Sequence, residues 1–277
     1  MSRTLALVFD FDDTLAHDST TDLLASKGVD VARFWAKENR TLIEAGWDPV
    51  LSYMYQMIQL SQSLAPGQRL TKSTLTAFGP QVRFYPGVPE LFTYLRDFVR
   101  AEDHTFQLEF YVISSGLGDL IRATPIAGEF TDIFASDFAY DADGQLAFPQ
   151  RVVSFTDKTR YLFQISKGQV GPEFANKPFE VNRKVRELRI PLANMIFIGD
   201  GMTDVPCFSL MAKNNGTALA VYDRDNHEKK LKAWGFVEDG RVKNLHSANY
   251  RRDSDLVGSI EMSLRFLISK NRSVYQG

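Results

Sequence analysis

Disulfide bonds and strong charge of either sign are missing from this sequence. Cys207 is the one cysteine among 277 residues, so no disulfide can form within the chain. Such a sequence suits a reducing compartment, and we expect a cytoplasmic protein. Lysine and arginine (32) nearly balance aspartate and glutamate (34), for a net charge of −2. Because this balance gives no basic field for a polyphosphate backbone, nucleic acid is not an expected partner.

Long apolar runs are missing as well. No segment approaches the roughly 18 consecutive apolar residues that a membrane-spanning helix needs. The apolar stretch at the N-terminus runs into aspartates instead of a signal-peptide cleavage site. We therefore expect a soluble protein that does not bind a membrane, and the sequence leaves its oligomeric state open.

Four short apolar runs have the composition of buried strands, and segments of helical composition lie between them. Such runs are typical of strands covered on both faces in a parallel sheet. The alternation predicts an α/β fold with a Rossmann-like parallel sheet. The four runs are residues 6–9, 110–113, 152–155 and 195–198, and two of the helical segments are residues 88–100 and 182–188.

Residues 19–84 differ from the rest because they contain helical spacings and no strand-like run. We expect an inserted domain of three or four helices here, with the core domain formed by residues 1–18 and 85–277. Residues 52–57 are rich in methionine and aromatic side chains, which favours the inside of a helical bundle over a surface that contacts substrate.

The stretch from residue 138 to 148 predicts a β-hairpin, with Asp141 and Gly144 in its turn. A calcium loop is the alternative, but the later ligands of such a loop are absent. No pattern in residues 168–177 assigns a role to that segment.

Residues able to carry out chemistry follow each apolar run, at the strand ends where open α/β sheets bind ligands. Each motif has an ordinary alternative, such as a helix cap or a surface lysine. Hydroxyls beside a glycine also suit a phosphate oxygen, and paired carboxylates suit Mg²⁺. In chain order the motifs are Asp10, Asp12, Asp13 and Thr14, then Ser114, Ser115 and Gly116, then Lys158, and finally Asp200 and Asp204.

Three lysines compete for the role of the cationic residue. Lys167 and Lys177 are rivals, and Lys177 lies closer in sequence to the last motif. We favour Lys158 because a predicted buried strand directly precedes it.

The ordered set Asp10-x-Asp12-x-Thr14, Ser114, Lys158 and Gly199-Asp200-Gly201-x-x-Asp204 resembles the haloacid dehalogenase-type (HAD) hydrolase superfamily. Within it, the chain resembles the phosphoserine phosphatase-like branch, in which a helical cap is inserted between the first and second motifs. The resemblance spans nearly the whole chain. It implies a HAD-like α/β core and identifies residues 19–84 with the cap.

The same resemblance implies a mechanism. Asp10 would attack phosphorus and form an aspartyl phosphate, while Asp12 would serve as general acid and then as general base. The resemblance places Mg²⁺ between the Asp10 side chain, the Asp12 main-chain carbonyl and Asp200, and Lys158 would add a second positive charge. Thr14 and the Ser114-Ser115-Gly116 segment would hold the phosphoryl group. Asp204 would support the metal or Lys158 from outside direct coordination.

The expected function is a Mg²⁺-dependent phosphatase of a small phosphorylated metabolite. The alternatives are a phosphotransferase or phosphomutase with the same intermediate, and a binding or regulatory protein without turnover. The second aspartate, Asp12, argues against dehalogenase chemistry. Ser19 stands where phosphoserine phosphatases place a glutamate for the substrate ammonium group, so phosphoserine is not the expected substrate, although the neighbouring Asp18 could substitute.

Overall fold

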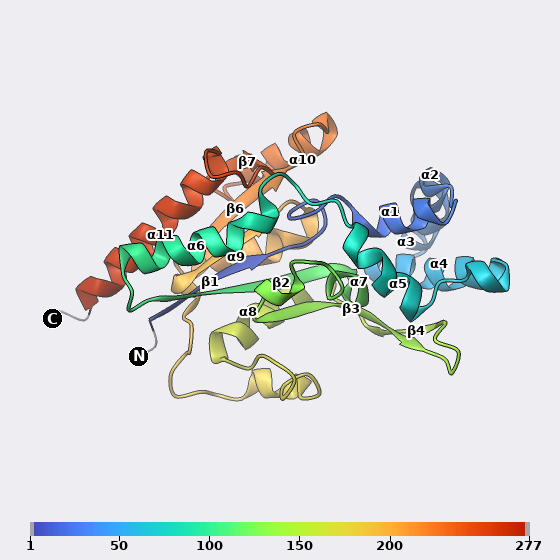
Figure 1. The fold of residues 1–277 in the computed structure, drawn as a ribbon, viewed down its shortest axis with the longest axis horizontal. Helices are drawn as coiled ribbons and strands as arrows, with labels where there is room; N and C mark the ends of the chain where they lie inside the picture. The colour runs from blue at the N-terminus through green and yellow to red at the C-terminus, as the bar shows by residue number, and fades with distance from the viewer. Residues whose placement is uncertain (1–2, 275–277) are drawn as a thin grey trace.

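The computed structural model describes residues 3–274. A seven-stranded sheet in the order β4-β3-β2-β1-β5-β6-β7 forms its centre (Figure 1). Neighbouring strands run parallel except β3 and β4, which pair antiparallel. The expected α/β class is confirmed. The strands are β1 (Thr4–Phe9), β2 (Gln107–Leu117), β3 (Asp132–Tyr140), β4 (Leu146–Arg151), β5 (Met195–Gly199), β6 (Thr217–Tyr222) and β7 (Leu245–Ser247).

Helices cover both faces of the sheet. Alternate side chains of β1 therefore pack in two different hydrophobic cores, one on each face. Leu7 and Phe9 pack in one core with residues of α6 (Val88–Glu102) and α11 (Asp255–Val274). Ala6 and Val8 pack in the other with residues of α8 (Asp157–Lys167), α9 (Val205–Lys213) and α10 (His227–Glu238). Burial on both faces explains why β1 is a continuous apolar run.

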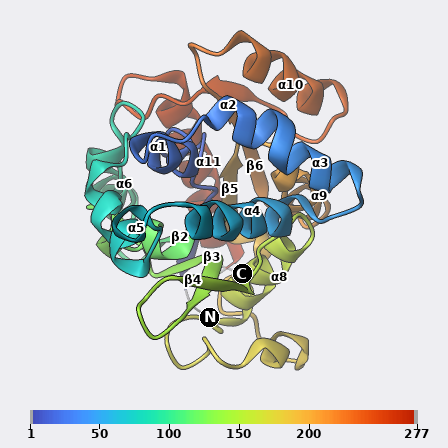
Figure 2. The same ribbon diagram turned by 90° about the vertical axis from the view of Figure 1, so that its right-hand side faces the viewer.

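Residues 19–84 form helices that lie across the end of the sheet where the parallel strands terminate (Figure 2). Tyr53, Met54 and Met57 are buried, which agrees with the bundle interior expected for residues 52–57. The division of the chain into two domains stays a prediction. The helices are α1 (Ser19–Ser26), α2 (Val31–Arg33), a π-helix (Phe34–Asn39), α3 (Arg40–Glu44), α4 (Pro49–Ser63) and α5 (Lys72–Phe78).

The remaining helices are short. They are α7 (Gly118–Ile121) and the 3-10 turns Pro66–Gln68, Gly79–Gln81, Ala127–Glu129, Pro178–Asn182, Leu192–Asn194 and Met202–Asp204. Within the described part of the chain, no helix has the length and apolar character needed to span a membrane.

The expected strand at residues 152–155 is wrong. Strand β4 ends at Arg151, and an irregular segment leads from there into α8. Val153 is fully buried, and its N–H donates to Ser136 Oγ at 3.0 Å instead of to a neighbouring strand. Residues 152–155 are therefore apolar because the irregular connection between β4 and α8 is buried.

The expected helix at residues 182–188 is also wrong. A 3-10 turn ends at Asn182, and no helix continues it. The apolar side chains of this segment, Val185 and Leu188, are 37% and 47% exposed. Without a buried face, charge alternation alone does not stabilise a helix.

The predicted hairpin is confirmed, because β3 and β4 are antiparallel and adjacent. Asp141 Oδ1 closes its turn by accepting from the main-chain N–H groups of Asp143 and Gln145, at 3.0 and 2.8 Å. Gly144 has a φ of +76°, which favours glycine. The carboxylate of Asp141 thus serves the turn.

Candidate active site

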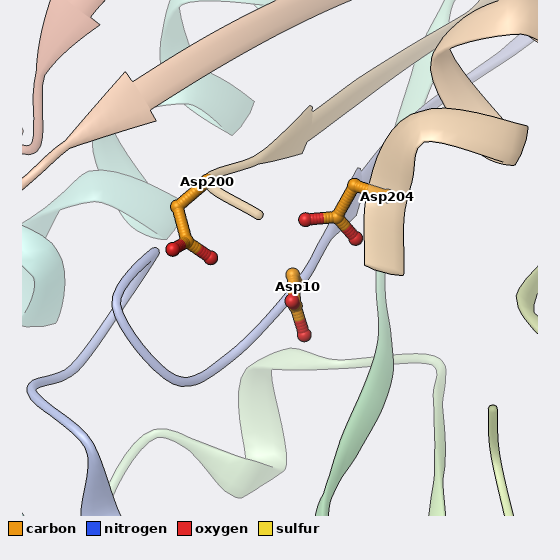
Figure 3. A group of neighbouring side chains, drawn as sticks. All are labelled: Asp10, Asp200 and Asp204. Carbon is orange, nitrogen blue, oxygen red and sulfur yellow. The ribbon is translucent and has the colours of Figure 1, made fainter. Parts of the chain in front are cut away.

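Three carboxylates converge where β1 and β5 end. Asp10 follows β1 and Asp200 follows β5, and these parallel strands are neighbours in the sheet. The main-chain N–H of Asp10 donates to the Ile198 carbonyl at 2.9 Å, which fixes the two strand ends against each other. One carboxylate oxygen each from Asp10, Asp200 and Asp204 lie within 4.8 Å of one another (Figure 3). Oxygen atoms so placed suit a hard divalent cation.

Lys158 is the cation of this cluster. It is the second residue of α8, and its side chain is fully buried. Its Nζ donates to Asp10 Oδ2 and to Asp204 Oδ1, each at 2.8 Å. Burial alone lowers the pKa of Lys158, but the two carboxylates outweigh it and raise the pKa, so the ammonium stays charged.

The rival lysines lie elsewhere. Lys177 is exposed, and its Nζ lies 5.4 Å from the centre of the Phe174 ring. Lys167 Nζ donates to the carbonyls of Val181 and Arg183, at 2.5 and 2.8 Å. The structure therefore brings Lys158, and neither rival, to Asp10.

Asp204 has both carboxylate oxygens engaged by protein donors. Oδ1 accepts from Lys158, and Oδ2 accepts from the Gly201 N–H at 3.0 Å. Burial, with Asp10 adding to it and Lys158 opposing, raises the pKa of Asp204 to about 6. A Cβ on Gly199 would collide with this carboxylate. These contacts fit a residue that orients Lys158.

Asp12 lies in the loop after β1, beside the end of β2. Its Oδ1 accepts from the Ser19 N–H at 2.8 Å, and a Cβ on Gly116 would collide with its Oδ2. Burial, followed by the nearby Asp18 carboxylate, raises the pKa of Asp12 well above its usual value. The protonated form of Asp12 is thereby favoured.

Strand β2 continues through the motif that was expected to follow it. Its register against β3 shifts between Ile113 and Leu117, where Ser114, Ser115 and Gly116 lie. Ser114 Oγ accepts from the Gly116 N–H at 2.9 Å. The register shift therefore gives this stretch a local geometry unlike that of the regular strand before it.

Thr14 contacts one of the candidate metal ligands, Asp200. Its Oγ1 lies 3.4 Å from Asp200 Oδ1, as a donor to that oxygen. The hydroxyl of the buried Tyr250 donates to the Thr14 carbonyl at 2.9 Å. Burial, with Asp204 and Asp10 nearby, raises the pKa of Asp200 well above its usual value.

Two residues that contact the site were not singled out from the sequence. Tyr53, in α4, donates its hydroxyl to the Ser115 carbonyl at 2.6 Å. Lys229, in α10, contacts Asp13 Oδ2 at 2.5 Å. Tyr53 lies in a segment that the sequence predicts to be buried, and a buried tyrosine needs a hydrogen-bond partner for its hydroxyl. This need is the sequence feature that could have identified Tyr53. Lys229 has no such identifying feature in the sequence, because charged residues on helices are usually exposed to solvent.

The haloacid dehalogenase-like hydrolase family matches residues 7–209. A protein of Borreliella burgdorferi (strain B31), described as uncharacterized, is 27% identical over 279 residues, covering 91% of this chain and 93% of that protein.

Solved structures show the same fold. A probable phosphoserine phosphatase from Vibrio cholerae aligns with a TM-score of 0.58 and 13% identity, over 97% of this chain and 67% of that one. An apo phosphoserine phosphatase aligns with a TM-score of 0.56 and 16% identity, over 90% and 95%. The fold is thus that of phosphoserine phosphatase-like hydrolases. Because the family match covers most of the sequence, the chain belongs to the haloacid dehalogenase-like hydrolase family.

Proposed function

We propose that the protein is a Mg²⁺-dependent phosphatase that hydrolyses a small phosphomonoester through an aspartyl phosphate on Asp10. The observation that carries the proposal is the buried contact of Lys158 with Asp10, beside the carboxylate of Asp200. A cation against the nucleophile and further carboxylates for a metal are what phosphoryl transfer needs.

The donor set fits the metal. Asp10 and Asp200 offer carboxylate oxygens, and Asp12 would add its main-chain carbonyl. Both oxygens of Asp204 accept hydrogen bonds, but so do both oxygens of Asp10, so the supporting role of Asp204 rests on the family resemblance. When bound there, Mg²⁺ would neutralise charge on the phosphate and orient it.

The residues themselves would perform two half-reactions. A carboxylate oxygen of Asp10 forms a bond to phosphorus while the bond to the leaving oxygen breaks, and Asp12 gives that oxygen its proton. Asp12, now ionised, takes a proton from water as the water oxygen attacks phosphorus and frees Asp10. Lys158 holds the Asp10 carboxylate in place throughout. Thr14 and Ser114 would position the loop and the phosphoryl oxygens.

Residues 19–84 would act as the cap that excludes water from the site. Their position at the strand ends (Figure 2) and the Tyr53 contact with Ser115 support this role. Ser19 is 1% exposed and brings no charge toward the leaving group, which argues for a substrate other than phosphoserine. The cytoplasmic location stays a prediction.

A panel of phosphomonoesters, including p-nitrophenyl phosphate, tests the proposal. We expect inorganic phosphate release that requires Mg²⁺ and is lost in Asp10→Asn. Hydrolysis without an added acceptor would separate a phosphatase from a phosphotransferase. A wild-type protein inactive on the whole panel, or an Asp10→Asn variant of unchanged rate, would contradict the proposal.

A further inference from the structure

Asp13 has an unusual backbone conformation in the loop that carries the proposed catalytic acid. Its φ is +57°, in the left-handed region that side chains other than glycine disfavour. A residue keeps such a conformation where the contacts around it hold it there. Because Asp13 directly follows Asp12, the contacts that hold Asp13 also affect how Asp12 is oriented.

The main chain supplies one of these contacts. The Asp13 N–H donates to the Ala16 carbonyl at 2.6 Å, and the Ala16 N–H donates to the Phe11 carbonyl at 3.1 Å. These two bonds pair Asp12 with Ala16 in a short parallel bridge. In a trans peptide, as this one is, the carbonyl and the N–H point in opposite directions. The Asp12 carbonyl shares its peptide with the Asp13 N–H and therefore points away from Ala16.

Lys229 supplies a second contact from a distant part of the chain. Its Nζ donates to Asp13 Oδ2 at 2.5 Å, across 216 positions of sequence. The two side chains are 35% and 18% exposed, so the ion pair is partly buried. Burial alone lowers the pKa of Lys229, but the contact with Asp13 outweighs it and raises the pKa. Burial raises the pKa of Asp13, and the Lys229 contact opposes that rise. The contact thus favours the charged form of both groups.

The first turn of α10 holds Lys229 in place. Asn226 caps this helix, and its Oδ1 accepts from the Lys229 N–H at 3.1 Å. Farther along α10, Phe236 is buried, and its ring centre lies 5.7 Å from that of Phe208 in α9. The ammonium group is therefore presented to Asp13 by a helix that is packed on the core.

The residues after Asp13 are held independently of Lys229. The Thr14 carbonyl accepts from the Tyr250 hydroxyl at 2.9 Å, and the Leu15 N–H donates to the Phe11 carbonyl at 2.8 Å. Because these residues are fixed, a change of φ at Asp13 has to turn the peptide that precedes Asp13. Such a turn redirects the carbonyl of Asp12.

We propose that Lys229 is a positioning residue, which holds Asp13 in its left-handed conformation and thereby orients the Asp12 carbonyl for Mg²⁺. This inference rests on the proposed function, in which that carbonyl is a ligand of the metal. Lys229 touches neither the metal nor the substrate in this role. Residues that orient metal ligands from outside the coordination shell typically contribute about 10- to 100-fold to metal affinity or activity.

Calorimetric titration of the full chain with Mg²⁺ tests the proposal without a substrate. Lys229→Met removes the ammonium group and keeps a long side chain, and we expect it to weaken Mg²⁺ binding by about tenfold or more. Loss of a positive charge near the site would by itself strengthen Mg²⁺ binding, so the expected change has the opposite sign from a charge effect. Unchanged or tighter binding in Lys229→Met overturns the proposal.

Lys230→Met is the matched control. Lys230 is the next residue of α10, is exposed, and has its Nζ 5.5 Å from the centre of the Tyr222 ring. Its replacement changes the net charge by the same amount as Lys229→Met. We expect this variant to keep the wild-type Mg²⁺ affinity within about twofold, since exposed charges are screened. Equal weakening in the two lysine variants overturns the specific role of Lys229.

Variants of Asp13 test the backbone conformation itself. Asp13→Gly and Asp13→Ala both remove the carboxylate, so they change the charge equally, but glycine alone of the two adopts a positive φ readily. We expect Asp13→Ala to bind Mg²⁺ more weakly than Asp13→Gly by about fivefold or more. Equal affinities in these two variants overturn the proposal, and this pair decides if Lys229→Met does not fold.

The combined variant of Lys229→Met with Asp13→Gly separates positioning from a general effect on stability. It has the wild-type net charge, and glycine keeps the left-handed conformation without the ammonium group. We expect Asp13→Gly to restore the Mg²⁺ affinity of Lys229→Met to within about threefold of the wild type, since the two changes act on one conformation and are not additive. A combined variant that binds as weakly as Lys229→Met overturns the proposal.

Failure of this inference can be distinguished from failure of the proposed function. Wild-type protein without saturable Mg²⁺ binding, or Asp200→Asn with wild-type affinity, would contradict the proposed metal site and this inference with it. Wild-type binding that depends on Asp200 and is equally tight in Lys229→Met overturns the inference alone.

Discussion

The hydroxyl of Tyr53 donates a 2.6 Å hydrogen bond to the main-chain oxygen of Ser115. This bond joins α4 to the end of β2, where Gly116 lies against the Asp12 carboxylate. Ser136 Oγ donates to the same Ser115 oxygen at 3.1 Å. Burial, followed by the charge of Asp12, raises the pKa of Tyr53, so its hydroxyl keeps its proton. The position of α4 and the geometry of the Ser114–Gly116 segment are therefore linked through one carbonyl group.

Tyr53→Phe should lower kcat because it removes this bond and keeps the ring. Loss of one neutral hydrogen bond, about 0.7–1.4 kcal/mol, corresponds to a decrease of about 3- to 10-fold. Steady-state kinetics measure the effect. Tyr55→Phe, on the same helix with its ring 4.9 Å from that of Trp47, is the matched control and should keep the wild-type rate. Equal rates in the two variants would refute the link.

Gly116→Ala should impair catalysis, since its Cβ would collide with the Asp12 carboxylate. Displacement of a proton donor by about 1 Å can reduce rate by about 100-fold. Gly128→Ala is the control, because a Cβ at that exposed glycine meets nothing within 4 Å. Comparable kcat values for the two variants would show that Asp12 is not held where the structure places it.

Lys158→Ala should abolish turnover, and Lys177→Ala should preserve it. The first change also leaves Asp10 and Asp204 buried without their cation, which typically costs about 3–5 kcal/mol of stability. Activity assays and denaturant unfolding measure the two effects. Full activity in Lys158→Ala, or its loss in Lys177→Ala, would reassign the catalytic lysine.

Metal-free protein should lose stability as pH rises. Burial raises the pKa of Asp204 from 3.8 to about 6, so the folded state holds a proton that the unfolded state has released. The stability from this proton is fully present below pH 3.8 and is lost as pH rises through about 6. Asp12 and Asp200 act in the same direction.

Thermal unfolding with a chelator should therefore show a midpoint that falls between about pH 4 and about pH 7. Mg²⁺ should raise the midpoint, most strongly at the higher pH, and Asp200→Asn should reduce this rise. A midpoint that climbs with pH in the chelated protein, or that ignores Mg²⁺ in both proteins, would contradict the proposed metal site.

The convergence of Asp10 and Asp200 could be predicted from the sequence because each motif is local. Asp10 and Asp200 directly follow strands buried on both faces, and such strands show as continuous apolar runs. Because the two strands pair in parallel, their carboxyl ends lie side by side, and no other contact is needed to predict this. Lys158, which lies against Asp10, was favoured on a wrong premise, since an irregular connection precedes it instead of a strand. An apolar run in the sequence does not by itself distinguish a buried strand from a buried irregular connection.

Other features depend on contacts that local pattern does not encode. Strand β7 has three half-buried residues, which are too few to show the alternation of apolar and polar side chains that marks a strand. The bond from Tyr53 to Ser115 joins residues 62 positions apart and depends on how α4 docks on the sheet. The pairing of β3 with β4 begins only at Asp137, and this start depends on tertiary register.

The turn of the β3–β4 hairpin has a consequence for motion. Its Gly144 carbonyl accepts from the Lys72 N–H at 2.8 Å, and Gln145 Oε1 accepts from Arg69 Nη1 at 2.8 Å, so the hairpin tip is fastened to the segment that enters α5. If α1 to α4 swing away to admit substrate, this attachment is a natural pivot. The mouth would then widen on the side away from the fastened tip, and large leaving groups would have to enter there.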